Sequence, residues 1–293
     1  MGNPALFLEP PSLLERGVYS DCNEGFPPNE FRTSIPRVRW FAVLLMLLHA
    51  AAAEVLHFAA EATSADLSFP LANGQLGTLV SGSTGTEILP LLAAPQSPAA
   101  DSAKPGTGFA GKPLGEFRFE WLDAAAEVTD YRRQLDLATG IATTTFQRGT
   151  AGFTATAFIS RADDLLVLHL RTDKPGFLSF RVRLTQGDAK PAIEDRRILV
   201  LPQARAWVYP MESEVTPGDG EITVKGEGEA LILLASTSDP AKIGQLPDRL
   251  KAIGFGGKEH PDIQAIWTGL LERQKKAPAA PDFPAYLKAL SKP

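Results

Sequence analysis

Acidic side chains near the ends of predicted strands are the first candidates for chemistry in this sequence. Glu116, Glu120, Asp123 and Asp130 occupy such positions. A pair of carboxyl groups can cleave a covalent bond when one donates a proton and the other activates water or attacks carbon. No spacing singles out such a pair, so we expect these four side chains to be solvated and assign no catalytic residue.

Histidine and nucleophile patterns point to no independent catalytic centre. The chain after residue 53 contains His57, His169 and His260, without a His-x-x-x-His or Glu-x-x-His grouping. Metal sites require more closely clustered ligands, so the sequence predicts no metal and no cofactor. It also lacks a Gly-x-Ser-x-Gly elbow and a phosphate loop. His169 alternates with leucines, which predicts a place on the outer face of a sheet.

Two local strings are more informative. In the first, Phe69–Gly82, the pair Asn73-Gly74 flanked by apolar residues predicts a hairpin turn. The second, Thr129–Leu137, is followed by Ala138-Thr139-Gly140, and without any ligand it is typical of a strand leading into a turn, with its arginines paired to nearby acids. The candidate ligand-binding or domain-interface residues in these strings are Asn73, Gly74, Gln75, Gly77, Asp130, Tyr131, Arg132 and Arg133.

The elements that must position these strings are mostly strands. From about residue 114 apolar residues recur with period two, as in Leu178–Thr185, where Leu178, Phe180, Val182 and Leu184 alternate with polar residues. Many short strands separated by Pro-Gly turns predict a mainly β fold, an antiparallel β-sandwich of the supersandwich type, followed by a short helical tail. Residues 93–111, rich in Ala, Ser, Pro and Gly, predict a long, poorly ordered loop.

The ends of the chain differ from this β region. Arg32, Arg37 and Arg39 precede the apolar run Trp40–Ala53, the order of a secretory signal, and its 14 residues are shorter than the roughly 20 that span a membrane. We therefore predict an N-terminal extension with a signal peptide at about 32–53, a secreted or periplasmic protein and no membrane span after cleavage. After the β domain of 54–238, we predict that residues 239–293 form a helical tail or linker, with apolar spacing typical of helices in Pro240–Ile253 and Pro261–Lys275. In the second of these the predicted apolar stripe consists of Ile263, Ile266, Trp267 and Leu270.

The net charge argues against two classes of partner. The net charge of −5 gives no broad cationic surface, so we expect neither nucleic acid nor an anionic membrane surface as a partner. The only cysteine, Cys22, precedes the apolar run, so the exported chain would have no disulfide and no thiol nucleophile.

The strings in this order resemble the N-terminal β-sandwich domain of family 95 glycoside hydrolases, the α-L-fucosidase-type enzymes. The first is similar to the family's Leu-Pro-Leu-Gly-Asn-Gly-x-Leu-Gly-Ala-Met-Val-x-Gly and the second to Asp-Tyr-x-Arg-x-Leu-Asp-Leu. The likeness continues through Asp164–Leu170 and Leu231–Thr237 and covers about residues 66–238. Ala72 stands where the family commonly has glycine, and the stretch after Gly85 lacks the family's Asn-Glu-x-x-Leu-Trp-x-Gly.

The resemblance implies a glycoside hydrolase domain without its catalytic part. The family carries its acid and water-activating groups on an (α/α)6 barrel that follows the sandwich, and Glu259–Trp267 is similar to the first helix of that barrel. The leading hypothesis is an exported, carbohydrate-associated sandwich domain that is non-catalytic alone. The alternatives are an enzyme subunit completed in trans by a separate barrel and a structural envelope protein.

Overall fold

The computed structural model describes residues 55–96, 110–122, 126–212, 215–245 and 262–277, together with positions 248, 250 and 251. The predicted signal peptide, Asp123 and His260 lie outside the described residues. The domain boundaries predicted from the sequence stay predictions.

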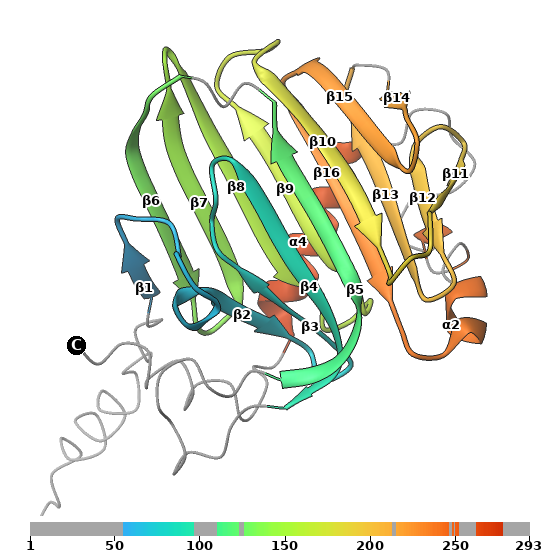
Figure 1. Ribbon diagram of the computed structural model, residues 1–293. Coiled ribbons are helices and arrows are strands. Elements are labelled where there is room, and N and C mark those ends of the chain that lie inside the picture. Colours follow the sequence, from blue (N-terminus) through green and yellow to red (C-terminus); the bar gives the residue numbers. More distant parts are fainter. Residues whose placement is uncertain are drawn as a thin grey trace, which may run out of the picture. The chain divides into compact units, whose positions relative to one another are not determined.

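Two antiparallel sheets form the domain, which confirms the predicted fold class (Figure 1). In spatial order the larger sheet contains β1 (Val55–Phe58), β6 (Val128–Asp136), β7 (Ile141–Arg148), β8 (Ala151–Ile159), β9 (Leu166–Thr172), β16 (Glu229–Ser236), β13 (Ala204–Pro210), β12 (Ile198–Leu201) and β11 (Ala192–Glu194). The smaller contains β14 (Val215–Pro217), β15 (Glu221–Glu227), β10 (Leu178–Thr185), β5 (Ala110–Trp121), β4 (Thr86–Gln96), β3 (Leu76–Val80) and β2 (Phe69–Ala72). A 3-10 turn, η1 (Ala65–Leu67), precedes β2.

The main core lies between the sheets and follows from the period-two pattern. On β10, Phe180 and Val182 are fully buried, whereas Arg181 and Arg183 point outward and pair with Glu221. Successive side chains of a strand point to opposite faces, so each sheet contributes one apolar face to the same interior.

A second apolar cluster covers part of the outer face of the larger sheet. Val167 of β9 and Leu231 of β16 belong to it, packed beneath the helix α4 (Ile263–Lys276). The stripe of Ile263, Ile266 and Leu270 predicted from the helical spacing is the face that packs there. A short helix, α2 (Pro240–Gly244), follows β16. The described helices after β16 therefore pack on the sandwich. Among the described residues no helix is long and apolar enough to cross a membrane.

One prediction from composition is partly wrong. Residues 93–96 end β4 and residues 110–111 begin β5, so both ends of the predicted loop are strand. The two strands pair at Ala93 with Lys112 and at Gln96 with Ala110. Cross-strand hydrogen bonding accommodates this small-residue sequence, which local composition alone does not reveal. Residues 97–109 lie outside the described part of the chain.

Candidate functional site

The Asn73 turn of the first string joins the two sheets. It connects β2 to β3 as predicted, with Gly74 at φ +88°. Asn73 Oδ1 accepts hydrogen bonds from the backbone N–H groups of Gln75 (3.0 Å) and Leu76 (2.9 Å). Its Nδ2 donates across to the larger sheet, to the Ser160 carbonyl (3.0 Å) and to Asp164 Oδ1 (2.9 Å). Asn73 thus positions its neighbours, while Gly77 pairs within the β2–β3–β4 ladder.

The second string turns two of its four candidates into the sandwich. Arg133 is only 2% exposed, and its guanidinium donates to the carbonyls of Ala60 (Nε, 2.7 Å) and Leu67 (Nη1, 2.8 Å). The same group lies over the rings of Phe58 and Phe69, at 4.5 and 4.7 Å from their centroids. The expectation that this arginine pairs with an acid is therefore wrong, because backbone carbonyls and rings satisfy it. Burial lowers the pKa of Arg133.

The other three candidates of this string differ in exposure. Asp130, at φ +52°, and Arg132 are exposed at a bulge in β6. The Tyr131 hydroxyl donates to the Gly82 carbonyl at 2.7 Å, and burial raises the pKa of this phenol. Tyr131 thereby connects the second string to the last residue of the first.

Gly82 shows why the two strings meet so closely. Its φ is +74°, and a Cβ there would lie 2.6 Å from the Tyr131 hydroxyl and 2.9 Å from Thr144 Oγ1. Only glycine fits both the backbone conformation and the space. The strings therefore meet in a packed structural contact.

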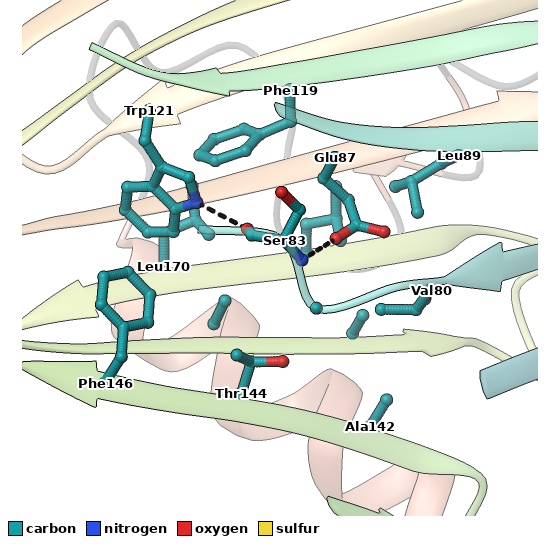
Figure 2. Close-up of a pocket in the computed structure, with 14 residues that line it drawn as sticks. Val80, Ser83, Glu87, Leu89, Phe119, Trp121, Ala142, Thr144, Phe146 and Leu170 are labelled. Carbon is teal, nitrogen blue, oxygen red and sulfur yellow. Dashed lines mark hydrogen bonds between the residues drawn. The ribbon is translucent and has the colours of Figure 1, made fainter. Parts of the chain in front are cut away.

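An interior cavity lies next to this contact, between the sheets (Figure 2). Its volume is about 40 Å³, and its walls are mostly apolar, with Phe119, Trp121 and Leu170 among them. The Glu87 carboxylate lies at one side and accepts hydrogen bonds from Ser81 N (2.6 Å), Ser81 Oγ (2.9 Å) and Ser83 N (2.6 Å). Burial raises the pKa of Glu87. The space suits one or two water molecules and is too small for a sugar ring.

Sequence reasoning missed Glu87, although a signal was present. Glu87 shares its parity along β4 with Leu89 and Leu91, both fully buried. A period-two reading of this strand would have placed the carboxylate inside.

A larger opening lies at one end of the sandwich, where the Asn73 turn faces the end of β16 and α2. This rim cleft has a volume of about 360 Å³ and is lined by Gln75, Leu76, Ala93, Asp164, Ala235, Ser236, Thr237, Ser238, Asp239, Lys242 and Ile243. Of the eight residues predicted as candidates, only Gln75 lines it. Asp164 follows β8, whereas Asp239 and Lys242 belong to the N-cap and first turn of α2. Only folding brings these two segments together, so local motif reading missed the residues.

A buried polar cluster holds α4 on the larger sheet. His169 Nε2 lies 2.5 Å from Glu229 Oε1, Gln264 of α4 donates to Glu229 Oε2, and the Trp267 ring stacks on the imidazole at 4.1 Å. Burial is the main cause that lowers the pKa of His169, and Glu229 opposes it. His169 does lie on the outer face, as predicted, but α4 covers it.

The turn after the second string holds the other end of α4. Gln274 Nε2 donates to the Thr139 carbonyl at 2.7 Å, and Gln274 Oε1 accepts from Arg161 N at 3.2 Å. The Arg161 guanidinium donates to the Ala277 carbonyl at 2.9 Å. The chain therefore leaves the sandwich along a helix fixed at both ends. Among the residues described, no three His, Cys, Asp or Glu side chains gather in a way that could hold a metal ion.

Comparison with known proteins agrees with the sandwich architecture. Residues 96–239 match the family model described as glycosyl hydrolase family 65, N-terminal domain. The chain contains a glycosyl hydrolase-related N-terminal domain. A similar curated protein is alpha-L-fucosidase 2 of Arabidopsis thaliana, 26% identical over an alignment of 149 residues that covers 39% of this chain and 18% of that protein.

A solved structure is also similar to this glycosyl hydrolase-related chain. It is a putative kojibiose phosphorylase from human microbiome, with a TM-score of 0.41 and 13% identity over 76% of this chain and 37% of that one. The chain thus spans less than a fifth of the length of the curated relative and little more than a third of the length of the solved one.

Proposed function

We propose that this chain is an exported, carbohydrate-associated sandwich domain of an α-L-fucosidase-type glycoside hydrolase of family 95, and that it is non-catalytic by itself. The observation that carries the proposal is that residues of the two family-like strings make structural hydrogen bonds within the sandwich. Asn73, Tyr131 and Arg133 all hold the sandwich together through hydrogen bonds to other segments. These strings act as scaffold and not as a catalytic centre.

The fucosidase type is favoured by two observations. The ordered strings around Asn73 and Tyr131 are similar to the pattern of family 95. A curated relative over 149 residues is named an alpha-L-fucosidase. The match to the family 65 N-terminal model supports the coarser assignment to a glycosyl hydrolase N-terminal domain, since that match also concerns an N-terminal sandwich.

For the interior of the sandwich, the non-catalytic part of the proposal is supported by the small cavity and by the hydrogen bonds that its carboxylate already accepts, and an activity assay tests the rim cleft. Acid–base cleavage of a glycosidic bond needs two carboxyl groups about 5 to 9.5 Å apart, with the sugar between them. The interior cavity has a volume of about 40 Å³, and the one carboxylate lining it, Glu87, already accepts three hydrogen bonds.

The decisive experiment is an activity assay on the purified chain. With nitrophenyl α-L-fucoside and nitrophenyl β-D-galactoside we expect no release of nitrophenol above the buffer rate. Hydrolysis that disappears in the Asp164→Asn variant but survives in Glu116→Gln, an exposed carboxylate on β5, would overturn the proposal and identify an active centre in the rim cleft.

Export is supported by the arginines before Trp40–Ala53 and by the start of β1 at Val55, one residue after the predicted cleavage point. Expression in a bacterium with a Sec pathway should give a periplasmic or secreted form whose N-terminal residue is Glu54. Retention of the full chain in the cytoplasm would contradict export.

A subunit completed in trans by a separate (α/α)6 barrel is the second candidate. The match covers 18% of the fucosidase relative, and in this candidate the separate barrel would correspond to part of the remainder. The apolar stripe of α4 already packs on its own sheet, so a partner would contact the polar side of this helix. Co-purification of a barrel protein with restored hydrolysis would establish this candidate, and the exposed Glu272→Lys and Lys276→Glu variants should then weaken the complex.

A further inference from the structure

The rim cleft has one wall that a single side chain organises. Asn73 binds the backbone N–H of Gln75 through Oδ1 and the Asp164 carboxylate through Nδ2. Asp164 lies in the turn between β8 and β9 at φ +55°, a conformation that aspartate tolerates better than most residues. A residue of the smaller sheet and a residue of the larger sheet are therefore held side by side on this wall.

The opposite wall is the end of β16 with the first turn of α2. Asp239 is held by two hydrogen bonds: its Oδ1 accepts from Ala241 N at 3.0 Å, and its N–H donates to Thr237 Oγ1 at 3.1 Å. Lys242 follows one turn later and is exposed. Both carboxylates of the cleft are thus oriented before any ligand arrives.

The floor is aliphatic. Leu76, Ala93, Ala235 and Ile243 are each at most 8% exposed and together line the base of the opening. An aliphatic base surrounded by polar groups matches a ring that has C–H faces and hydroxyl edges. The volume of about 360 Å³ is at the lower end of the range for small-ligand sites, so it suits one ring and not an oligomer.

The charged groups of the rim cleft restrict the class of ligand further. Ionised carboxylates only accept hydrogen bonds, so a ligand that contacts Asp164 and Asp239 must offer hydroxyl donors. The charged groups of the described lining are two carboxylates and the ammonium of Lys242, and this excess of acidic groups disfavours uronates and phosphates.

From this geometry we infer that the rim cleft binds one neutral monosaccharide unit. Asp164 and Asp239 accept from its hydroxyls, Lys242 and Gln75 donate to its oxygens, and Asn73 acts as a positioning residue. The inference rests on the proposed carbohydrate association and assigns it to one place. It gives the Asn73 string a role in recognition besides its role in the turn.

The test is a titration of the isotope-labelled purified chain, followed by amide resonances in NMR spectra. With methyl α-L-fucoside and methyl β-D-galactoside, we expect at least one to shift the amides of Gln75, Ser238 and Lys242, with a Kd on the order of 1 mM, as expected for a ligand of this size. Methyl β-D-glucuronide should bind at least tenfold more weakly than methyl β-D-glucoside because of the charge excess.

Variants decide whether the cleft is responsible. Lys242→Ala removes an exposed donor of the cleft and should raise the Kd about tenfold, as expected for loss of one charged hydrogen bond. Lys190→Ala, at a lysine that pairs with Asp219 outside the cleft, should leave the Kd unchanged. Asn73→Asp keeps the acceptor for the Gln75 N–H but places a negative charge against Asp164, so it should abolish binding with a melting transition that stays cooperative.

Three results would overturn the inference: no shift at 100 mM sugar, shifts confined to residues outside the cleft, or equal Kd values for Lys242→Ala and Lys190→Ala. Shifts elsewhere that saturate would leave the carbohydrate association standing and remove only its assignment to this cleft. Hydrolysis by the purified chain would instead contradict the proposed function, whatever the titration shows.

Discussion

Two buried carboxylates, one associated with each sheet, are stabilised in different ways. Glu87 of β4 faces the interior and is surrounded by the N–H groups and hydroxyl of the segment from Ser81 to Ser83. Glu229 of β16 faces outward beneath α4 and contacts the imidazole of His169 and the amide of Gln264. One carboxylate relies on neutral donors close in sequence, and the other on side chains 60 and 35 positions away.

The titratable group whose pKa is shifted, and the direction of that shift, differ between the two regions. Burial raises the pKa of Glu87 above its ordinary value of 4.5 despite three hydrogen bonds. In the second region burial is the largest cause acting on His169, and it lowers the pKa of this imidazole below 6.5. The molecule therefore has an interior site that favours a neutral carboxyl and an outer site that favours a neutral imidazole.

The largest expected effect is that of Glu87→Ala. It leaves two backbone N–H groups and one hydroxyl without their partner inside the sandwich, so we expect a loss of about 4 kcal/mol in the free energy of unfolding. Urea denaturation followed by circular dichroism measures it. Glu116→Ala, at an exposed glutamate, should cost less than about 0.5 kcal/mol. A loss below about 1 kcal/mol for Glu87→Ala would show that the donors find other partners.

The next largest effect concerns Gly82, in the segment from Ser81 to Ser83 that donates hydrogen bonds to Glu87. Gly82→Ala combines positive φ with contact to Tyr131, and we expect a loss of about 3 kcal/mol. Gly149→Ala has a similar φ of +59° with nothing within 4 Å, and should cost only about 1 kcal/mol. The same urea titrations compare them. Equal losses would mean that backbone conformation alone requires glycine at Gly82.

At the outer site, His169→Ala removes the partner of Glu229 and the ring that stacks on Trp267. We expect a loss of about 2 kcal/mol, with faster amide hydrogen exchange along α4. His57→Ala, at an exposed histidine of β1, is the matched control and should change neither quantity. If exchange around Phe119 accelerates as much as exchange in α4, the outer site does not open independently of the interior.

The smallest effect is the pH dependence, about 1 kcal/mol or less at each site, and its sign separates the two sites. The raised pKa of Glu87 gives stability that is present below pH 4.5 and lost as pH rises through the folded pKa. The lowered pKa of His169 gives stability that is present above pH 6.5 and lost as pH falls through the folded pKa. The loss in free energy of unfolding caused by Glu87→Gln should therefore become smaller as the pH is raised. The loss caused by His169→Gln should become smaller as the pH is lowered. Urea titrations between pH 4 and 8 measure both losses, and parallel trends would contradict the opposite pKa directions.

Local pattern was sufficient for most of the fold. Period two along β10 and the Asn73-Gly74 turn predicted strands and a hairpin that the structure contains. The spacing of Ile263, Ile266 and Leu270 predicted a helix and its buried face. These succeed because side-chain direction depends on neighbours one to four residues away. The prediction was wrong at both ends of the loop at 93–111, because the residues there are strand through pairing with a segment that local composition does not reveal.

The amino-acid sequence by itself determined the sandwich class and the two strings, since alternation, turn residues and string order are all local properties. It could not show that Arg133 would lie over two neighbouring phenylalanine rings, or that Glu229 would contact His169. Nor could it place Asp164, Asp239 and Gln75 around one cleft. Those contacts join residues about 60 to 160 positions apart in the sequence, and only the pairing and packing of complete sheets decides which side chains meet.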